Sequence, residues 1–471
     1  MSFESRALET GTGGFAVETE RGRPRPAEVF AAGLRHHHLA NTAYPIAHRR
    51  TIWAHRRPVE EHARLLVQSL THSPEVSLYV HVPFCERRCA FCEYTVLDRH
   101  DAALEAAYFA ALKTQLARLT EGLGLAGKRL RGLDLGGGTP SLVEPARLGE
   151  IVAWVLARLR PAPGFGMSIE TTPKIAALAP ARLAAYRAFG IERISLGLQT
   201  VSAGLLHAYG REVQQVDHNR RAVENIRAAG FRTLNVDLMY GFARQGLDDW
   251  AESLRAAVAL GPEVITLYRM RYKGTRVEGE AAEAALSQAV AMAELAGRTL
   301  AEAGYHAPPG KNAYVRSARD PGTSAYLTSR VVESVPYLGL GLGAQTFTNH
   351  LLAYNHGAAT KQLEPYLRAL DAGELGIQDL YHLPPSEGMA KMISVSFYFG
   401  AVRLDTFQRR FGVALEERFP AEVEFVLGRG LMERAGSALR LTAAGAQSFP
   451  GVIALFYSAA VQRHLLGLEG G

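Results

Sequence analysis

Cysteine is scarce in this sequence. Only 3 of the 471 residues are cysteines, and an odd number of cysteines cannot all be paired in disulfides within one chain. Cys85, Cys89 and Cys92 follow one another in the spacing C-x3-C-x2-C. Three unrelated buried thiols would not be confined to one short segment, so this spacing predicts a site at which thiolates act together as metal ligands.

Long apolar runs and a strong excess of charge are also missing. We find no apolar run of about twenty residues and no signal peptide, which argues against a membrane protein and a secreted one. Thiols that must stay reduced indicate the cytoplasm. The formal charge of +6, from 52 basic and 46 acidic residues, is too small for this length to indicate a nucleic-acid-binding protein. We expect a monomer without a membrane or nucleic-acid partner.

The three cysteines fit an iron–sulfur cluster better than other metal sites. Thiolates are soft ligands, and a four-iron cluster ordinarily takes one cysteine for each iron. Three cysteines would leave one iron open to a ligand that does not come from the protein. A zinc site is the alternative, but it needs four protein ligands, and only His81 or His100 lies near enough in the sequence to complete it.

After the cysteines, segments with strand character alternate with segments with helix character. Strands are expected at 76–82, 130–135, 166–170, 193–198, 233–239 and 264–268. Helices are expected at 101–121, 181–188, 217–229 and 247–260, and one more helix is expected to end at about residue 159. Such alternation predicts parallel β-α-β units. Six strands are enough for an α/β fold of the partial (β/α)6 barrel type, in which chemistry collects at the carboxyl ends of the strands.

Glycine and polar residues stand where these strands end. Gly137, Gly138 and Thr139 follow the second strand, and glycine lets backbone N–H groups approach an anionic ligand closely. A tight turn is the plainer explanation of the glycines taken alone. The later strand ends add polar side chains, namely Glu170, Gln199, Asp237 and, shortly after the fourth strand, Arg211.

The segment from Tyr79 to Tyr94 reads Tyr-x-His-x-Pro-Phe-Cys-x3-Cys-x-Phe-Cys-x-Tyr, and it resembles the radical S-adenosylmethionine (SAM) superfamily. Within that superfamily it is most similar to the oxygen-independent coproporphyrinogen oxidase (HemN-like) branch, which also contains heme chaperones, heme-opening enzymes and class C methyltransferases and cyclopropanases. The resemblance implies a [4Fe-4S] cluster on the three cysteines and SAM chelated to the open iron. One electron from the cluster then splits a carbon–sulfur bond of SAM and gives a deoxyadenosyl radical.

The resemblance also gives roles to the residues at the strand ends. It implies contacts with the first SAM from Tyr79, Gly137, Glu170, Gln199, Arg211 and Asp237. It further implies a second SAM beside the first, contacted by Phe91, Gly138, Thr139, Ala344 and Gln345. The last two lie in a glycine-rich loop at 339–346, for which a packed turn is the alternative.

Differences between this sequence and the HemN-like pattern indicate which reaction to expect. Coproporphyrinogen oxidases carry a fourth cysteine two residues after the third, where this chain has Tyr94. Heme chaperones carry a His-Asn-x-x-Tyr-Trp motif, whose histidine and tryptophan are absent at 311–314. We therefore expect a class C methyltransferase or cyclopropanase that uses two SAM molecules to transfer a methyl or methylene group to an sp2 carbon of a small-molecule substrate. A tetrapyrrole enzyme and a non-catalytic heme chaperone are the alternatives.

The remaining expectations concern the substrate pocket, the partner and the domains. The pocket residues are expected to be Tyr94, Tyr268, Arg269, Arg271 and Gln345. The resemblance implies an electron donor such as flavodoxin or ferredoxin. It divides the chain into an N-terminal extension (1–70), the barrel (71–350) and a mainly helical, winged-helix-like C-terminal domain (351–471).

The N-terminal extension contains a basic, histidine-rich segment at 35–57. It is either a solvated arm on the surface of the barrel or a cap that closes over the substrate and supplies cations to it.

Overall fold

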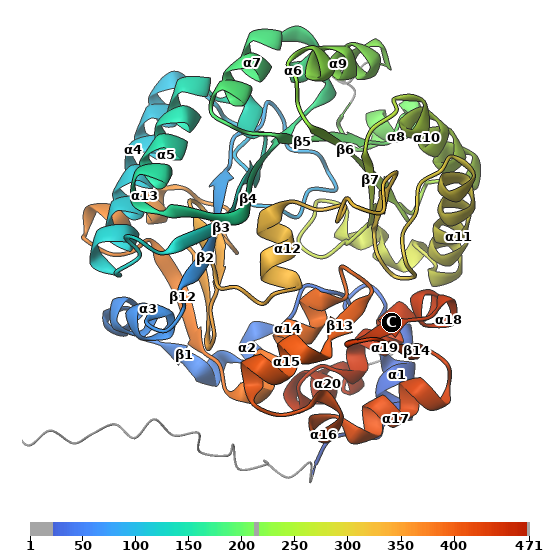
Figure 1. Cartoon of the computed structure of the whole chain (residues 1–471). Helices are drawn as coiled ribbons and strands as arrows, with labels where there is room; N and C mark the ends of the chain where they lie inside the picture. The colour runs from blue at the N-terminus through green and yellow to red at the C-terminus, as the bar shows by residue number, and fades with distance from the viewer. Residues whose placement is uncertain (1–21, 212–215, 469–471) are drawn as a thin grey trace, which may run out of the picture.

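A twelve-stranded sheet dominates the computed structural model, which describes residues 22–211 and 216–468 (Figure 1). The strand order is β1-β12-β11-β10-β9-β2-β3-β4-β5-β6-β7-β8. The strands are β1 (Arg56–Arg57), β2 (Glu75–Val82), β3 (Arg129–Gly137), β4 (Arg160–Thr171), β5 (Arg193–Gln199), β6 (Thr233–Tyr240), β7 (Val264–Arg269), β8 (Ala313–Val315), β9 (Tyr337–Leu340), β10 (Gln345–Phe347), β11 (Leu351–Asn355) and β12 (Ile377–His382). The strands β2 to β7 run parallel to one another, as do β9 and β2, and the other neighbours in the sheet are antiparallel.

The predicted partial (β/α)6 barrel is confirmed. Helices connect the six parallel strands and cover their outer face, as Figure 1 shows. These helices are α4 (Ala102–Ala117), α5 (Pro145–Arg158), α6 (Pro173–Leu178), α7 (Pro180–Ala188), α8 (Ala203–Ala208), α9 (Val216–Ala228), α10 (Leu247–Ala259) and α11 (Leu286–Glu302). The boundaries of the predicted strands and helices differ from the observed ones by a few residues, except that β4 begins six residues earlier, at Arg160. The helices α6, α8 and α11 were not predicted.

The two faces of the parallel strands carry different residues. In β3, Leu133 and Leu135 belong to the large apolar core that packs under the helices. Gly132 and Asp134 alternate with them and face the inside of the barrel, because successive side chains of a strand point to opposite sides. The face of β3 that points into the barrel therefore carries small or polar residues, whereas the face toward the helices is apolar. The small residues leave room for a ligand inside the barrel.

Helix α12 (Ala325–Val331) fills the other end of the barrel interior, near the amino ends of the strands. It lies in the middle of the molecule in Figure 1. A Cβ atom on Gly132 would stand 2.2 Å from the backbone nitrogen of Tyr326, so only glycine allows α12 to approach β3 this closely. The Ser324 hydroxyl, at the N-cap of α12, donates to Asp134 at 2.6 Å. The carboxyl ends of the strands stay uncovered by this helix.

The strands β9 to β12 extend the sheet beyond the six predicted strands. Flanking helices in this part are α2 (His48–Thr51), α3 (His62–Leu70) and α13 (Glu364–Asp371). Because β11 and β12 pair with strands of the large sheet, residues 351–382 are continuous with the barrel sheet. The division of the chain at 351 stays a prediction.

The C-terminal part is mainly helical and has a small sheet of its own. Its helices are α14 (Pro385–Ser396), α15 (Leu404–Phe411), α16 (Leu415–Arg418), α17 (Pro420–Gly428), α18 (Ala443–Gln447), α19 (Phe449–Leu455) and α20 (Ala459–Leu466). Its three strands, β13 (Ala401–Arg403), β15 (Ala438–Leu441) and β14 (Met432–Ala435), are antiparallel. A separate apolar core holds these elements together.

The first described helix, α1 (Pro26–Arg35), packs into this C-terminal core and not onto the barrel. Val29 and Ala32 are buried in the same apolar cluster as Val452. A Cβ atom on Gly33 would stand 2.4 Å from the Pro450 carbonyl oxygen, so α1 and α19 are in close contact. The first 21 residues of the predicted extension lie outside the described residues. Within the part of the chain that the structure describes, no helix is long and apolar enough to span a membrane.

Candidate functional site

A cavity of about 680 Å³ lies at the carboxyl ends of the parallel strands. Its wall comes from the barrel, from the segment after α1 and from the C-terminal part. It brings together most of the residues that the sequence predicts for the site, namely Cys85, Cys89, Phe91, Cys92, Tyr94, Gly137, Gly138, Thr139, Glu170, Gln199, Arg211, Asp237, Tyr268, Arg269 and Arg271. Tyr79, Ala344 and Gln345 are not part of this wall.

The three cysteines lie in the loop that follows β2, and backbone hydrogen bonds fix this loop. The Cys85 N–H donates to the Leu97 carbonyl at 3.0 Å, and the Ala90 N–H donates to the Tyr209 carbonyl at 3.0 Å. The Cys92 N–H donates to the Cys89 carbonyl at 3.2 Å, which closes a turn between the last two cysteines. All three thiols are partly buried and unpaired with one another.

The surroundings of the thiols suit metal-bound thiolates. An Arg211 guanidinium N–H donates to the Cys89 Sγ at 3.4 Å, and the Thr139 hydroxyl lies 3.5 Å from the Cys85 Sγ. Burial raises the pKa of the Cys85 thiol to about 12 and also raises the pKa of Cys92, so these two thiols are protonated when no metal is bound. A bound iron would deprotonate them, because a coordinating metal strongly favours the thiolate.

Within the described residues, no three His, Cys, Asp or Glu side chains are placed to hold one metal ion. A four-iron cluster does not require this, because each cysteine binds a separate iron. The zinc alternative does require it, and both candidate histidines are engaged elsewhere. The His81 Nε2 lies 2.6 Å from the Thr95 carbonyl, and the His100 Nε2 lies 2.7 Å from Glu105. The donor set therefore fits an iron–sulfur cluster and not a structural zinc ion.

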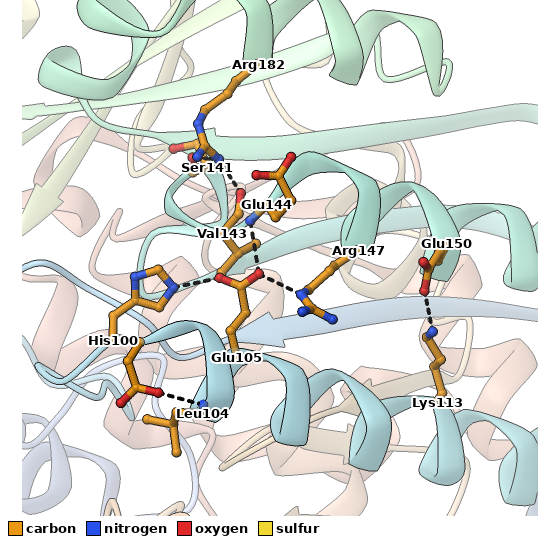
Figure 2. Close-up of polar contacts among 11 residues, drawn as sticks. His100, Leu104, Glu105, Lys113, Ser141, Val143, Glu144, Arg147, Glu150 and Arg182 are labelled. Atoms are coloured by element: carbon orange, nitrogen blue, oxygen red, sulfur yellow. Dashed lines mark hydrogen bonds and ion pairs between the residues drawn. The ribbon is translucent and has the colours of Figure 1, made fainter.

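His100 belongs to a network of hydrogen bonds and ion pairs that lies next to the cysteine loop (Figure 2). The Glu105 carboxylate, on α4, contacts the His100 ring and accepts hydrogen bonds from the Glu144 N–H at 3.1 Å and the Arg147 guanidinium at 2.8 Å. The His100 ring in turn packs against Phe84, which precedes the first cysteine. The network joins the end of the loop to the start of α5, and its role is structural.

The glycine turn after β3 packs tightly against the start of the cysteine loop. A Cβ atom on Gly138 would stand 2.7 Å from the Phe84 carbonyl oxygen, and the Gly138 N–H donates to the Val82 carbonyl at 2.8 Å. Gly137 has a φ of 118°, a backbone conformation that favours glycine. The glycines thus allow the turn to pack closely against the cysteine loop, and a contact with SAM stays a prediction.

Two carboxylates inside the cavity have strongly raised pKa values. Burial and the nearby charge of Asp237 raise the pKa of Glu170 to about 8, although the side chain is open to the cavity. Burial raises the pKa of Asp237 to about 7, against a hydrogen bond of 2.8 Å from the Asn235 amide. A cationic ligand would lower both pKa values and be held by the two carboxylates. SAM, with its sulfonium and ammonium groups, is a ligand of this kind.

Gln199 adds an unsatisfied acceptor to the same cavity. Its Oε1 atom is buried and has no hydrogen-bond partner within the described residues, and the residue has a φ of 65° although it is not glycine. An unpaired buried acceptor is costly, so a ligand that donates a hydrogen bond fits this position. Arg211 is anchored by a hydrogen bond to the Gly197 carbonyl, at the same strand end.

The predicted residues that miss the cavity wall are packed elsewhere. Tyr79 stacks on Tyr326, with ring centroids 5.9 Å apart. Ala344 is buried, and the Gln345 amide is hydrogen-bonded to the hydroxyl groups of Tyr337 and Tyr354. Their contacts with a first or second SAM stay predictions.

The substrate side of the cavity contains residues that sequence reasoning predicted and others that it missed. Tyr94 and Tyr268 are 53% and 38% exposed, so their rings are uncovered in the cavity. Residues on the wall that were not named as pocket residues include His37, His38, Lys311 and Tyr398. His37 and His38 belong to the histidine-rich segment at 35–57, which was the only feature of the sequence that could have indicated them.

Comparisons with known proteins agree with this geometry. Residues 79–257 match the model of the radical SAM superfamily, and residues 399–447 match the model of the HemN C-terminal domain. The solved structure of coproporphyrinogen III oxidase (HemN) from Escherichia coli superposes with a TM-score of 0.71 and covers 86% of this chain and 96% of that one. At 19% identity this likeness shows the fold.

Curated relatives are similar over different lengths. An oxygen-independent coproporphyrinogen III oxidase from Paracoccus denitrificans is 37% identical over 41% of this chain, and the match spans 42% of that relative. One from Cereibacter sphaeroides is 26% identical over 76% of this chain and 80% of its own length. The heme chaperone HemW from Escherichia coli is 29% identical over 42% of this chain and 51% of its own length.

Proposed function

We propose that this chain is a radical SAM enzyme that couples the reductive cleavage of SAM to the modification of a tetrapyrrole substrate that carries carboxylate groups. The matches of residues 79–257 to the radical SAM model and of residues 399–447 to the HemN C-terminal domain model support this proposal, as does the HemN-like fold. The sequence analysis gave a tetrapyrrole enzyme as an alternative to a class C methyltransferase or cyclopropanase. The relatives named above favour this alternative over methyl transfer to an unrelated small molecule.

The cavity wall is the observation that carries the proposal. At about 680 Å³ the cavity lies within the usual range for small-molecule sites, roughly 300–1,000 Å³. Tyr94, Tyr268 and Tyr398 offer aromatic faces to a flat ring system, and Arg269 and Lys311 offer positive charge to acidic substituents. A large ring with carboxylate side chains matches both features.

The residues present fit the cofactors that the superfamily implies. Cys85, Cys89 and Cys92 would hold a [4Fe-4S] cluster, with one iron left open. When bound, the cluster would supply the electron for the reductive cleavage of SAM, and SAM would supply the group that abstracts hydrogen.

The protein's own contribution is binding and orientation. Glu170 and Asp237 would hold a cationic group of the ligand, and the buried Gln199 side-chain carbonyl would accept a hydrogen bond from it. A second SAM is not needed for this proposal.

Methyl transfer to the same class of substrate is the second candidate. It is favoured by Tyr94, which stands where the oxidases carry a fourth cysteine and lies uncovered on the cavity wall. It differs from the first candidate in its products, because a methyl donor leaves as S-adenosylhomocysteine.

An anaerobic assay with reconstituted protein tests the proposal. SAM, a reduced flavodoxin or ferredoxin, and coproporphyrinogen III or heme are combined, and deoxyadenosine and S-adenosylhomocysteine are measured. We expect a tetrapyrrole to raise deoxyadenosine formation at least tenfold. Deoxyadenosine without S-adenosylhomocysteine favours an oxidase, and both products favour methyl transfer. Heme binding without stimulation would indicate a carrier, and no effect of any tetrapyrrole would refute the proposal.

A further inference from the structure

Two arginines at the end of β7 have different partners. The Arg271 guanidinium forms an ion pair with Glu93, next to the third cysteine. Arg269 instead donates from Nη2 to the Nδ1 atom of His37 at 2.6 Å. Within the described residues, no carboxylate lies within ion-pair distance of Arg269. Arg271 is therefore neutralised by the protein, whereas the charge of Arg269 has no protein counter-charge.

His37 acts as a hydrogen-bond acceptor toward Arg269, and this determines what it offers to the cavity. Burial and the positive charge of Arg269 lower the pKa of His37 to about 3, so the ring is neutral at physiological pH. A neutral imidazole that accepts at Nδ1 carries its proton on Nε2. His37 lines the cavity, and no residue of the described chain accepts a hydrogen bond from its Nε2. Arg269 and His37 together thus present N–H donors to the cavity.

His37 is held in place by a segment that is fixed on both sides. Before it, α1 lies among α17, α19 and α20, as Figure 1 shows by the blue helix among red ones. After it, the Tyr457 hydroxyl donates to the Asn41 carbonyl at 2.7 Å, and Lys391 donates to the Tyr44 carbonyl at 2.6 Å. The neighbouring His38 packs edge-on against Tyr272. The donors are therefore preorganised, which lowers the cost of binding a ligand.

We propose that Arg269 and His37 form the binding site for a carboxylate group of the substrate, with the N-terminal segment supplying half of the site. A partly buried guanidinium without a counter-ion is costly, and an anion in the cavity lowers this cost. The proposal rests on the proposed function only in naming the tetrapyrrole as the source of the carboxylate. The carboxylate of SAM is the other possible source, but Arg211, which contacts Cys89, is placed near the cluster loop for that group.

Porphyrin titration of the reconstituted protein tests this site. The probes are coproporphyrin III, which has four carboxylates, and its uncharged tetramethyl ester, with binding followed by porphyrin fluorescence. We expect the wild type to bind the acid at least tenfold more tightly than the ester. Arg269→Gln should lose at least tenfold in affinity for the acid, about 1.4 kcal/mol, and His37→Ala about three- to tenfold. His37→Gln, which can both accept and donate, should retain most of the affinity.

Arg244→Gln is the matched control. It removes the same charge from a surface residue that pairs with Glu280 outside the cavity, and its affinity should stay within twofold of the wild type. Thermal unfolding of each variant checks that the fold is kept, and the KM for SAM in the reaction without porphyrin checks the first-SAM site.

Three results would overturn the site. They are equal binding of acid and ester by the wild type, unchanged acid binding by Arg269→Gln, and an Arg269→Gln effect confined to the KM for SAM. None of them bears on whether tetrapyrroles stimulate deoxyadenosine formation, which tests the proposed function separately.

Discussion

The Glu170 carboxylate accepts a hydrogen bond of 3.1 Å from the backbone N–H of Gly137. The two residues belong to neighbouring strands of the barrel, and the contact joins the glycine turn to the pair of carboxylates in the cavity. Although this hydrogen bond favours the ionised form, burial and Asp237 outweigh it and raise the pKa of Glu170 to about 8. In the protein without SAM, Glu170 is thus a neutral carboxylic acid at neutral pH, whereas a cationic ligand would need its ionised form.

The raised pKa of Glu170 predicts that the SAM-free protein loses stability as the pH rises from about 4.5 to about 8. Across this window the folded protein keeps a proton that the unfolded chain has released, so the free energy of unfolding falls with increasing pH. Glu170→Gln should flatten this dependence and raise the melting temperature at pH 8 relative to the wild type. Melting curves at several pH values check this.

The surface variant Glu192→Gln is the control for the melting experiment. Glu192 is exposed and lies 3.7 Å from Arg232, so this variant should keep the wild-type pH dependence. A Glu170→Gln variant with the same pH dependence as the wild type would contradict the assignment of the proton to Glu170.

The same carboxylates predict that SAM binds more tightly as the pH rises from about 6 to about 8. A cation bound beside Glu170 and Asp237 requires their ionised forms, so binding releases protons. One released proton gives at most about a tenfold change in affinity per pH unit. Anaerobic calorimetry in buffers of different ionisation enthalpy measures both the affinity and the proton release. Glu170→Gln should release fewer protons, and equal release by both proteins would count against this account.

The barrel and most of the site could be predicted from the sequence because they depend on local patterns. Apolar runs marked the six strands, and polar residues at their ends converge because the strands are parallel. The strands β9 to β12 were not predicted, since β9 and β10 are only four and three residues long and have little alternation. Such strands are stabilised by their neighbours in the sheet.

Contacts between distant segments explain what sequence reasoning missed at the site. The position of His37 depends on α1, which is buried against a helix near the other end of the chain, and no local pattern predicts that contact. Arg269 and Arg271 are alike in sequence, and only the structure shows that Glu93 neutralises one of them.

Each of the variants Cys85→Ala, Cys89→Ala and Cys92→Ala should abolish the iron–sulfur cluster. Three cysteines are the least that a cluster with one open iron can use, and the loop supplies no other thiolate. Iron and sulfide content after anaerobic reconstitution measures the loss. His100→Ala is the informative control, because it should keep the cluster while losing about 0.5–1.5 kcal/mol of stability with the hydrogen bond to Glu105, whose carboxylate still pairs with Arg147. Loss of metal in His100→Ala would support the zinc alternative instead.

Gly138→Ala should impair SAM cleavage without any change in a polar group. The added methyl group would meet the Phe84 carbonyl at 2.7 Å and the Pro83 backbone at 2.8 Å, so the glycine turn and the cysteine loop must move apart. Overpacking of this kind costs about 1–3 kcal/mol, and a displacement between the two segments changes how SAM meets the cluster. We expect at least a tenfold loss in the rate of deoxyadenosine formation. Gly428→Ala, a helix position with open space around it, should leave this rate unchanged. Wild-type activity in Gly138→Ala would show that the close contact between turn and loop is not required for the reaction.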